Sequence, residues 1–268
     1  MSIIAQRSAA LEPIVPCLVH KHSADNVWIR QPHPDTGTEA RLGYHYPENF
    51  EQARLADLIE VQRQAGIFYV HSHLGAPADH VFVLSSISLE RLTLSFDQPH
   101  EGLADGGSVV VRLHRAPVGT NTRLSFYLFA NAGMATGSAS VRLLPRRAYE
   151  RVRRLTASAP ISVPATEYVH VFPLAIEPHD PLVSDHESDH VPAMAVIVSI
   201  EQALIAFGAL RVDALSATFA SYINKDEQAL CRLNLQPDGA FVGVVEQRGT
   251  VRVTFEGRAA APGEKMRA

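Results

Sequence analysis

The sequence predicts an α+β protein built from two similar halves, each an antiparallel sheet wrapped around one buried helix. Two segments have helical periodicity, residues 49–73 and residues 191–208, and the second is apolar on almost every side, as a helix buried in a core is. Each is followed by several strand-like runs separated by turn residues, and each is preceded by one short strand-like run. One helix wrapped by a sheet, occurring twice, is the plan of a double hotdog fold.

The two halves also match each other when the sequence is shifted by 138 residues. The shift places Gln64-Ala65 on Gln202-Ala203 and the apolar pair Leu58-Ile59 on Val196-Ile197. Together with the repeated order of elements, these matches favour a duplication. A single barrel of eight or ten strands is the alternative, but it accommodates a fully apolar helix less naturally.

The domain boundaries follow from this repeat. We expect a first hotdog domain over residues 1–155 and a second over residues 167–268. The segment between them, residues 156–166, contains two prolines and no charged residue, which suits a linker. A double hotdog can close its sheet within one chain, so both a monomer and a homodimer are open.

The composition excludes several classes of function. The 268 residues are 46% hydrophobic and 19% charged with a net charge of −4, so no positive field argues for nucleic-acid binding. The sequence contains no run of 18 or more apolar residues, the length that a membrane-spanning helix needs. The two cysteines are far apart, and no secretion signal is evident, which excludes a disulfide scaffold and makes the cytoplasm the expected location.

The start of the second predicted helix is the first candidate for chemistry. Asp185-His186 and Asp189-His190 stand just before its Val-Pro-Ala-Met start. A helix N-terminus can hold a carbonyl oxygen or an oxyanion, and a histidine there can move protons. The alternative is that these residues only cap the helix and turn the loop.

The first predicted helix carries a polar cluster on one face. Glu60, Arg63 and Gln64 occupy positions i, i+3 and i+4 of an otherwise largely apolar helix. A buried glutamate with a raised pKa is a candidate general base, and an arginine beside it can hold a phosphate. The alternative is a solvated ion pair.

Two further patterns concern metals and partners. The spacing of His71 and His73 at a helix end does not complete a ligand set, so we expect no metal. Residues 142–154 contain six arginines, which indicates either a docking surface for an acidic carrier protein or phosphorylated substrate, or a solvated amphipathic helix. The predicted docking residues are Arg146, Arg147, Arg151, Arg153 and Arg154.

Four segments carry a family resemblance that spans nearly the whole chain. They read VHKHSADNVWI, ADLIEVQRQAG, RLLPRRAYERVRR and DHESDHVPAMAVIVSIEQA. In this order and spacing they resemble the A-factor biosynthesis (AfsA-type) hotdog proteins, whose two fused hotdog domains agree with the repeat.

The resemblance implies acyl transfer. A β-ketoacyl chain, carried as a thioester on the phosphopantetheine of acyl carrier protein, is joined to the hydroxyl of dihydroxyacetone phosphate. The ester leads to γ-butyrolactones or butenolides in secondary metabolism, and related domains release polyketide chains. The implied partners are a carrier protein or polyketide synthase module and a small phosphorylated triose, and no separate cofactor is needed.

The family's Glu-x-x-Arg-Gln pattern is complete only in the first half. Glu60, Arg63 and Gln64 match it, whereas Val198 and Glu201 replace the glutamate and the arginine in the second half. Either the second half is a scaffold, or this protein has changed its reaction or acceptor. The alternatives to acyl transfer are therefore a non-catalytic acyl-binding or carrier-docking module, and a hotdog thioesterase or hydratase.

The resemblance assigns a role to each candidate. Glu60 would act as base on the acceptor hydroxyl, Arg63 would hold the phosphate, and His186 would assist at the thioester carbonyl. We further expect Glu201 to pair with Arg63 across the pseudo-twofold axis. The remaining members of the predicted site are Gln64 as a catalytic residue and His190, Met194 and Gln202 as substrate-binding residues.

Overall fold

A computed structural model describes most of the chain. The described residues are 12–31, 39–47, 49–77, 79–92, 107–118, 121–130, 133–155, 167–177, 179–185 and 188–260. The predicted linker, residues 156–166, lies outside them.

The described strands form one twelve-stranded sheet in the order β1-β2-β3-β5-β6-β7-β4-β9-β12-β11-β10-β8. The first half contributes β1 (Glu12–Pro13), β2 (Ile29–Gln31), β3 (Glu39–Tyr44), β4 (His80–Leu92), β5 (Gly107–Val118), β6 (Asn121–Ala130) and β7 (Gly133–Pro145). The second half contributes β8 (His170–Pro173), β9 (Arg211–Phe219), β10 (Leu230–Leu235), β11 (Ala240–Gln247) and β12 (Thr250–Ala260).

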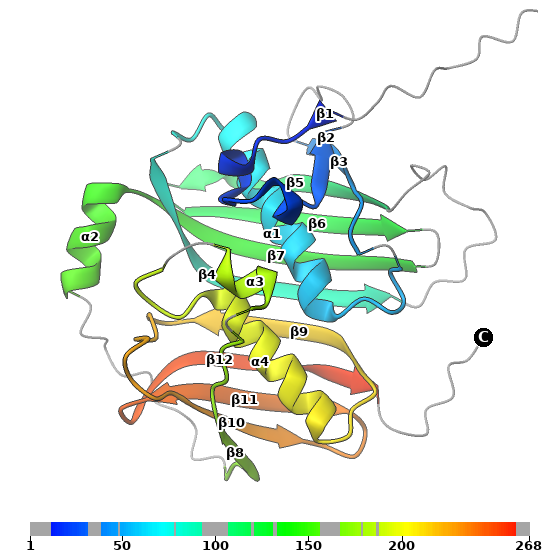
Figure 1. The fold of residues 1–268 in the computed structure, drawn as a ribbon, viewed down its shortest axis with the longest axis vertical. Helices are drawn as coiled ribbons and strands as arrows, with labels where there is room; N and C mark the ends of the chain where they lie inside the picture. Colours follow the sequence, from blue (N-terminus) through cyan, green and yellow to red (C-terminus); the bar gives the residue numbers. More distant parts are fainter. Residues whose placement is uncertain are drawn as a thin grey trace, which may run out of the picture.

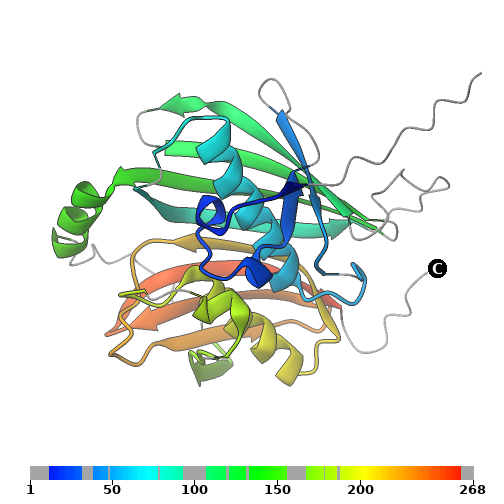
Figure 2. The same cartoon turned by 45° about the horizontal axis from the view of Figure 1, so that its top comes forward.

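Two central helices lie side by side on the same face of this sheet (Figure 1, Figure 2). They are α1 (Leu55–Ser72) and α4 (Ala193–Ala206), and their first residues are 138 positions apart (193 − 55), the shift that the sequence repeat predicts. α1 is buried on nearly every side, because the sheet covers one face and the N-terminal segment and α4 cover others. The shorter helices are η1 (Pro16–Val19), η2 (Ala24–Asn26), α2 (Arg146–Leu155) and α3 (Pro181–Ser184).

Strands β4 and β9 join the two halves. They pair antiparallel from Ser86 opposite Thr218 to Glu90 opposite Ala214, so the hydrogen-bonded sheet continues from one half into the other. The predicted α+β double hotdog is therefore confirmed, and the sheet is open rather than closed into the alternative barrel.

The ends of the elements differ from the prediction where side chains bond to the local backbone. The first helix begins at Leu55, not near Asn49, because the Asn49 side chain accepts the backbone N–H of Glu51 (3.0 Å) and turns the chain there. The Asp57 carboxylate then accepts the N–H of Arg54 at 3.1 Å and caps the helix. The strand-like run expected before the first helix is residues 17–29, and this segment contains the short helices η1 and η2 instead. The sequence did not predict β3.

Candidate functional site

The polar face of α1 forms a buried ion-pair cluster around Glu60. The Glu60 side chain is fully buried, and its Oε2 accepts from Arg63 Nε at 2.7 Å. Its Oε1 accepts from Arg63 Nη2 at 2.8 Å and from Gln64 Nε2 at 2.9 Å. The structure thus brings together the three residues that match the family pattern.

Lys21 is a fourth member of this cluster, and the sequence did not predict it. Its Nζ lies 3.1 Å from Glu60 Oε1 with only 2% of the side chain exposed, and it donates to the carbonyl of Pro181 at 3.4 Å. Lys21 is 39 positions before Glu60 (60 − 21), so no helical spacing connects them. The only signal in the sequence is that Lys21 stands inside the VHKHSADNVWI segment.

Gln64 fixes the N-terminal segment against α1. Its Oε1 accepts the backbone N–H of Trp28 at 2.8 Å, and its Nε2 donates to the carbonyl of Asn26 at 2.8 Å as well as to Glu60. All of these groups are buried or partly buried, so their hydrogen bonds need to be satisfied internally. Gln64 is therefore a positioning residue that holds the turn carrying Lys21 beside Glu60.

The charges of the cluster set the protonation of Glu60. Burial alone would raise its pKa, but Arg63, Lys21 and the hydrogen bond from Gln64 outweigh burial and lower the pKa to about 2. The pKa of Arg63 is raised, because the attraction of Glu60 and Asp185 exceeds the effect of its own burial. The expectation that Glu60 has a raised pKa is therefore wrong, since burial here comes with two cations.

The second half covers this cluster through Asp185, which follows α3. The Asp185 carboxylate accepts the backbone N–H of His22 at 2.9 Å, the N–H of Ser23 at 3.4 Å and the Asn26 Nδ2 group at 2.5 Å. The Glu60 cluster consequently lies at the boundary between the two halves. Of the side chains in it, Arg63 is the most accessible, with 19% exposed, and its Nη1 makes no hydrogen bond to a described residue.

Glu201 does not pair with Arg63, so that expectation is wrong. Its carboxylate instead accepts the backbone N–H of Leu55 at 2.7 Å and that of Ala56 at 3.0 Å, both in the first turn of α1. Unpaired N–H groups and the helix dipole make such a terminus attractive to an anion. Burial nevertheless raises the pKa of Glu201 despite the two N–H donors. Glu201 thus anchors α4 to α1.

A second polar cluster lies between α2 and the loop before α4. The His190 Nδ1 atom lies 2.7 Å from an oxygen of the Asp189 carboxylate, and its ring packs edge-on against Tyr222 with 4.8 Å between ring centroids. From α2, Arg153 Nε donates to Asp189 at 3.0 Å and Tyr149 Oη donates to it at 3.3 Å. His186, predicted to act at the same place, lies outside the described residues.

Two predicted substrate-binding residues of α4 lie apart from any polar cluster. Met194 is buried in the hydrophobic core, and Gln202 is exposed. Val198, which stands where the family pattern has a glutamate, is also buried in the core. None of the three makes a polar side-chain contact to another residue that the structure describes.

The arginines of α2 differ in their exposure. Arg146, Arg147 and Arg151 are exposed, whereas Arg153 points inward to Asp189 and lies over the Tyr222 ring at 4.4 Å from its centroid. The side chain of Arg154 lies outside the described residues. α2 stands at one end of the sheet, away from the two central helices (Figure 1).

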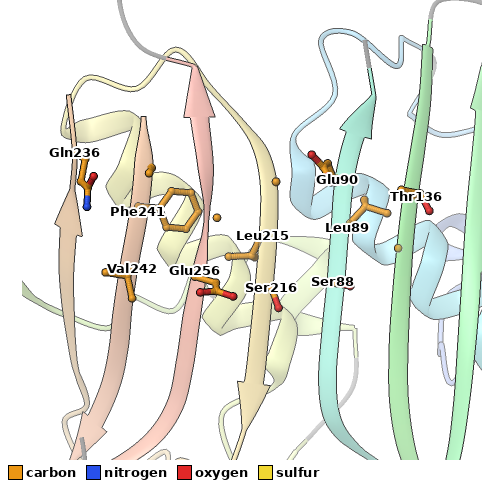
Figure 3. A pocket seen from close by; sticks show the side chains of 14 residues that line it. Ser88, Leu89, Glu90, Thr136, Leu215, Ser216, Gln236, Phe241, Val242 and Glu256 are labelled. Carbon is orange, nitrogen blue, oxygen red and sulfur yellow. The ribbon is translucent and has the colours of Figure 1, made fainter. Parts of the chain in front are cut away.

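The described residues also form an open groove of about 640 Å³ on the face of the sheet opposite the helices (Figure 3). It crosses the junction of the two halves and is lined by residues that include Ser88, Glu90, Phe241 and Glu256. None of the predicted site residues lines it.

The described residues contain neither a cluster of metal ligands nor a membrane-spanning helix. No group of three or more histidine, cysteine, aspartate or glutamate side chains there could hold a metal ion. His71 bonds to His20, with 3.0 Å between their Nε2 atoms, while His73 stacks on Tyr69, so the two rings of the His-x-His pattern have different neighbours. No helix in the described part is long and apolar enough to cross a membrane.

The half of the chain that contains the Glu60 cluster matches a known protein family. Residues 4–131 match the family described as the A-factor biosynthesis hotdog domain. The chain carries an A-factor biosynthesis hotdog domain. The match includes Lys21, Glu60, Arg63 and Gln64 and ends before α2. A search of curated proteins gives no match.

Solved structures resemble the A-factor biosynthesis hotdog domain together with the second half. The 12:0-ACP thioesterase from Umbellularia californica has a TM-score of 0.57 and 8% identity, and the match covers 86% of this chain and 100% of that one. A putative oleoyl thioesterase from Lactobacillus plantarum has a TM-score of 0.51 and 13% identity, covering 85% of this chain and 96% of that one. At such low identity the likeness establishes the fold alone.

Proposed function

We propose that this protein is an acyltransferase that moves a β-ketoacyl group from a carrier-protein thioester to the hydroxyl of a small phosphorylated acceptor. Dihydroxyacetone phosphate, or a similar three-carbon compound, is the acceptor that the resemblance implies. The matched A-factor biosynthesis domain supports an acyl-handling hotdog protein, and the two thioesterases of similar fold act, by their names, on acyl groups. The thiol is a good leaving group, so the transfer needs no metal or redox cofactor.

The arrangement of Arg63 is the observation on which this proposal rests. Its guanidinium is held by Glu60 through two parallel hydrogen bonds, while Nη1 makes none to a described residue. A guanidinium fixed on one edge and open on another can bind a phosphate or carboxylate at a defined place. Lys21 adds a second positive charge beside the same carboxylate, and the Asp185 carboxylate attracts both of these cations.

Glu60 has a different role from the one expected for it. Both of its oxygens accept hydrogen bonds from cationic groups, and a carboxylate with a pKa of about 2 is a weak base near neutral pH. We therefore assign Glu60 to positioning: it orients Arg63 and Lys21, and it does not take the proton of the acceptor hydroxyl.

The exposed face of α2 suits the carrier protein. Arg147 and Arg151 on this face, together with the exposed Arg146 at the start of the helix, concentrate positive charge on a protein whose net charge is −4. Such a patch attracts an acidic partner and favours one orientation of it. An acyl carrier protein is the occupant proposed for this face.

The test is to incubate the purified protein with a β-ketoacyl carrier protein, with and without dihydroxyacetone phosphate. Mass spectrometry would follow the free carrier thiol and the triose ester. Thiol release that depends on the triose, together with the ester, supports acyl transfer. Release without the triose indicates hydrolysis, and bound but unreacted acyl carrier indicates a non-catalytic module; either result contradicts the proposal.

A further inference from the structure

The assignment of Glu60 to positioning leaves the proposed transfer without a proton acceptor at that cluster. The attacking hydroxyl has to lose its proton as the ester forms, and the departing thiolate has to gain one. A side chain that does both has an accepting atom that is free of internal hydrogen bonds and open to a ligand. His71 fails this test, because its Nδ1 lies 2.9 Å from the Ala76 carbonyl and its Nε2 lies 3.0 Å from His20.

His190 meets this requirement. Its Nδ1 faces the Asp189 carboxylate at 2.7 Å and the Ser188 hydroxyl at 3.2 Å, whereas its Nε2 makes no hydrogen bond to a described residue. The side chain is 24% exposed, so the ring is held at Nδ1 and is partly accessible. A carboxylate on Nδ1 favours the tautomer in which Nδ1 carries the proton and Nε2 accepts.

Three segments that are distant in the sequence build the surroundings of this histidine. Arg153 of α2 donates to the Asp189 carboxylate at 2.9–3.0 Å and to its backbone carbonyl at 3.2 Å. Tyr149, also from α2, donates to the same carboxylate at 3.3 Å, and Tyr222, which follows β9, packs against the imidazole edge-on. Capping a helix would not need this arrangement, since α4 has Pro192 at its N-cap and no side-chain cap.

The charge environment keeps the imidazole able to accept a proton. Burial lowers the pKa of His190, and the neighbouring cations Arg153 and Lys225 add to this effect, while Asp189 opposes it. The net direction of the pKa shift is downward, which favours the neutral imidazole.

We propose that His190, oriented by Asp189, is the proton-transfer residue for the thioester reaction. Nε2 takes the proton from the acceptor hydroxyl as its oxygen bonds to the acyl carbon. The carbon–sulfur bond then breaks, and the imidazolium gives that proton to the sulfur, which leaves as the free carrier thiol. The products are the ester and the thiol, the imidazole is neutral again, and no other reactant is consumed. This inference rests on the proposed function.

The position of α2 connects this residue to the carrier. The outer face of α2 carries the exposed Arg147 and Arg151, and the opposite face holds the His190–Asp189 pair through Arg153 and Tyr149. A carrier bound on the outer face would therefore present its thioester close to His190. One helix of the first half thus contributes both to docking and to a reaction centre in the second half.

The chain offers a matched control for the test. Asp79-His80 is also an adjacent aspartate–histidine pair, its Nδ1–Oδ1 distance is 3.2 Å, and the His80 side chain is 22% exposed. No arginine or tyrosine contact to this second pair is present among the described residues. His80→Asn consequently removes a similar pair from a site without the surroundings of His190.

The experiment measures the rate of carrier-thiol release, with triose and without it, for wild type, His190→Asn, His190→Gln and His80→Asn. The two His190 variants should lose at least about 100-fold in rate while binding the acyl carrier with wild-type affinity and keeping the wild-type Tm, and His80→Asn should match wild type. A His190 variant that stays folded and retains more than a tenth of the rate would overturn the inference. Release to water alone in the wild type would refute the triose acceptor, and the same variants would still test His190.

Discussion

The carboxylate of Glu201 accepts the backbone N–H of Leu55, with 2.7 Å between Oε1 and N. This contact joins the middle of α4 to the first turn of α1, so the two central helices are held together at the N-terminus of α1. Replacing Glu201 with alanine leaves two buried N–H groups without an acceptor. We expect a loss of about 2 kcal/mol in the free energy of unfolding, measured by urea denaturation. Gln202→Ala, at the exposed neighbouring position, should change it by less than about 0.5 kcal/mol, and equal losses for both variants would contradict the role of Glu201.

Glu60 makes the stability dependent on pH in the acid range. Its pKa is about 2 in the folded protein against an ordinary value of 4.5, so the unfolded chain takes up the proton first as the pH falls. The contribution is therefore complete above about pH 4.5 and is lost towards pH 2, which amounts to about 2 kcal/mol between pH 5 and pH 3. Urea denaturation at these two pH values should show a smaller difference for Glu60→Gln than for wild type, with the exposed Glu90→Gln as control. An unchanged difference in Glu60→Gln would show that Glu60 does not contribute.

Lys21 should matter to stability as well as to the charge of the cluster. Lys21→Met removes one of the two cations beside the buried Glu60 carboxylate, while Arg63 and Gln64 remain. We expect a loss of about 2 kcal/mol, since a buried charge that loses a partner is costly. Lys225→Met removes an exposed lysine and should be close to neutral in the same thermal or urea measurement. If both variants had wild-type stability, the ion pair between Lys21 and Glu60 would be of no consequence.

The outer face of α2 should determine affinity for the carrier protein. Arg147→Glu combined with Arg151→Glu reverses two exposed charges and should weaken carrier binding at least 10-fold at low salt, measured by calorimetry. The difference from wild type should shrink as the ionic strength rises, because salt screens exposed charges. Arg123→Glu, an exposed reversal on β6, is the control. Carrier affinity that is equal in all of these proteins would refute docking on α2.

The sequence predicted the elements whose signal is local. The apolar pattern of α4 and the shift of 138 residues located both central helices and the repeated plan, and Glu60, Arg63 and Gln64 were grouped correctly by their spacing on one helix. Periodicity reports which residues share a face, and these features depend on little else.

The sequence patterns did not predict the contacts between segments that are distant along the chain. Lys21 reaches Glu60 only because the N-terminal segment folds over α1, and Glu201 finds Leu55 only because α1 and α4 lie side by side. The same reason explains why the pKa of Glu60 was expected to rise: burial could be inferred from the pattern, but the second cation could not. Arg153, expected on a docking surface, turns inward for the same kind of long-range contact with Asp189.

The continuous sheet across β4 and β9 has a consequence for how the two halves can differ. In a dimer of identical chains, every residue at the junction occurs on both sides of the twofold axis. An acidic side chain that stabilises the end of one central helix would therefore also be present at the end of the other. Here the two copies are on one chain, and Arg63 and Glu201 occupy equivalent positions with opposite charges. Covalent linkage thus allows the two halves to differ at the junction: Glu201 binds the first turn of α1, and Arg63 pairs with Glu60.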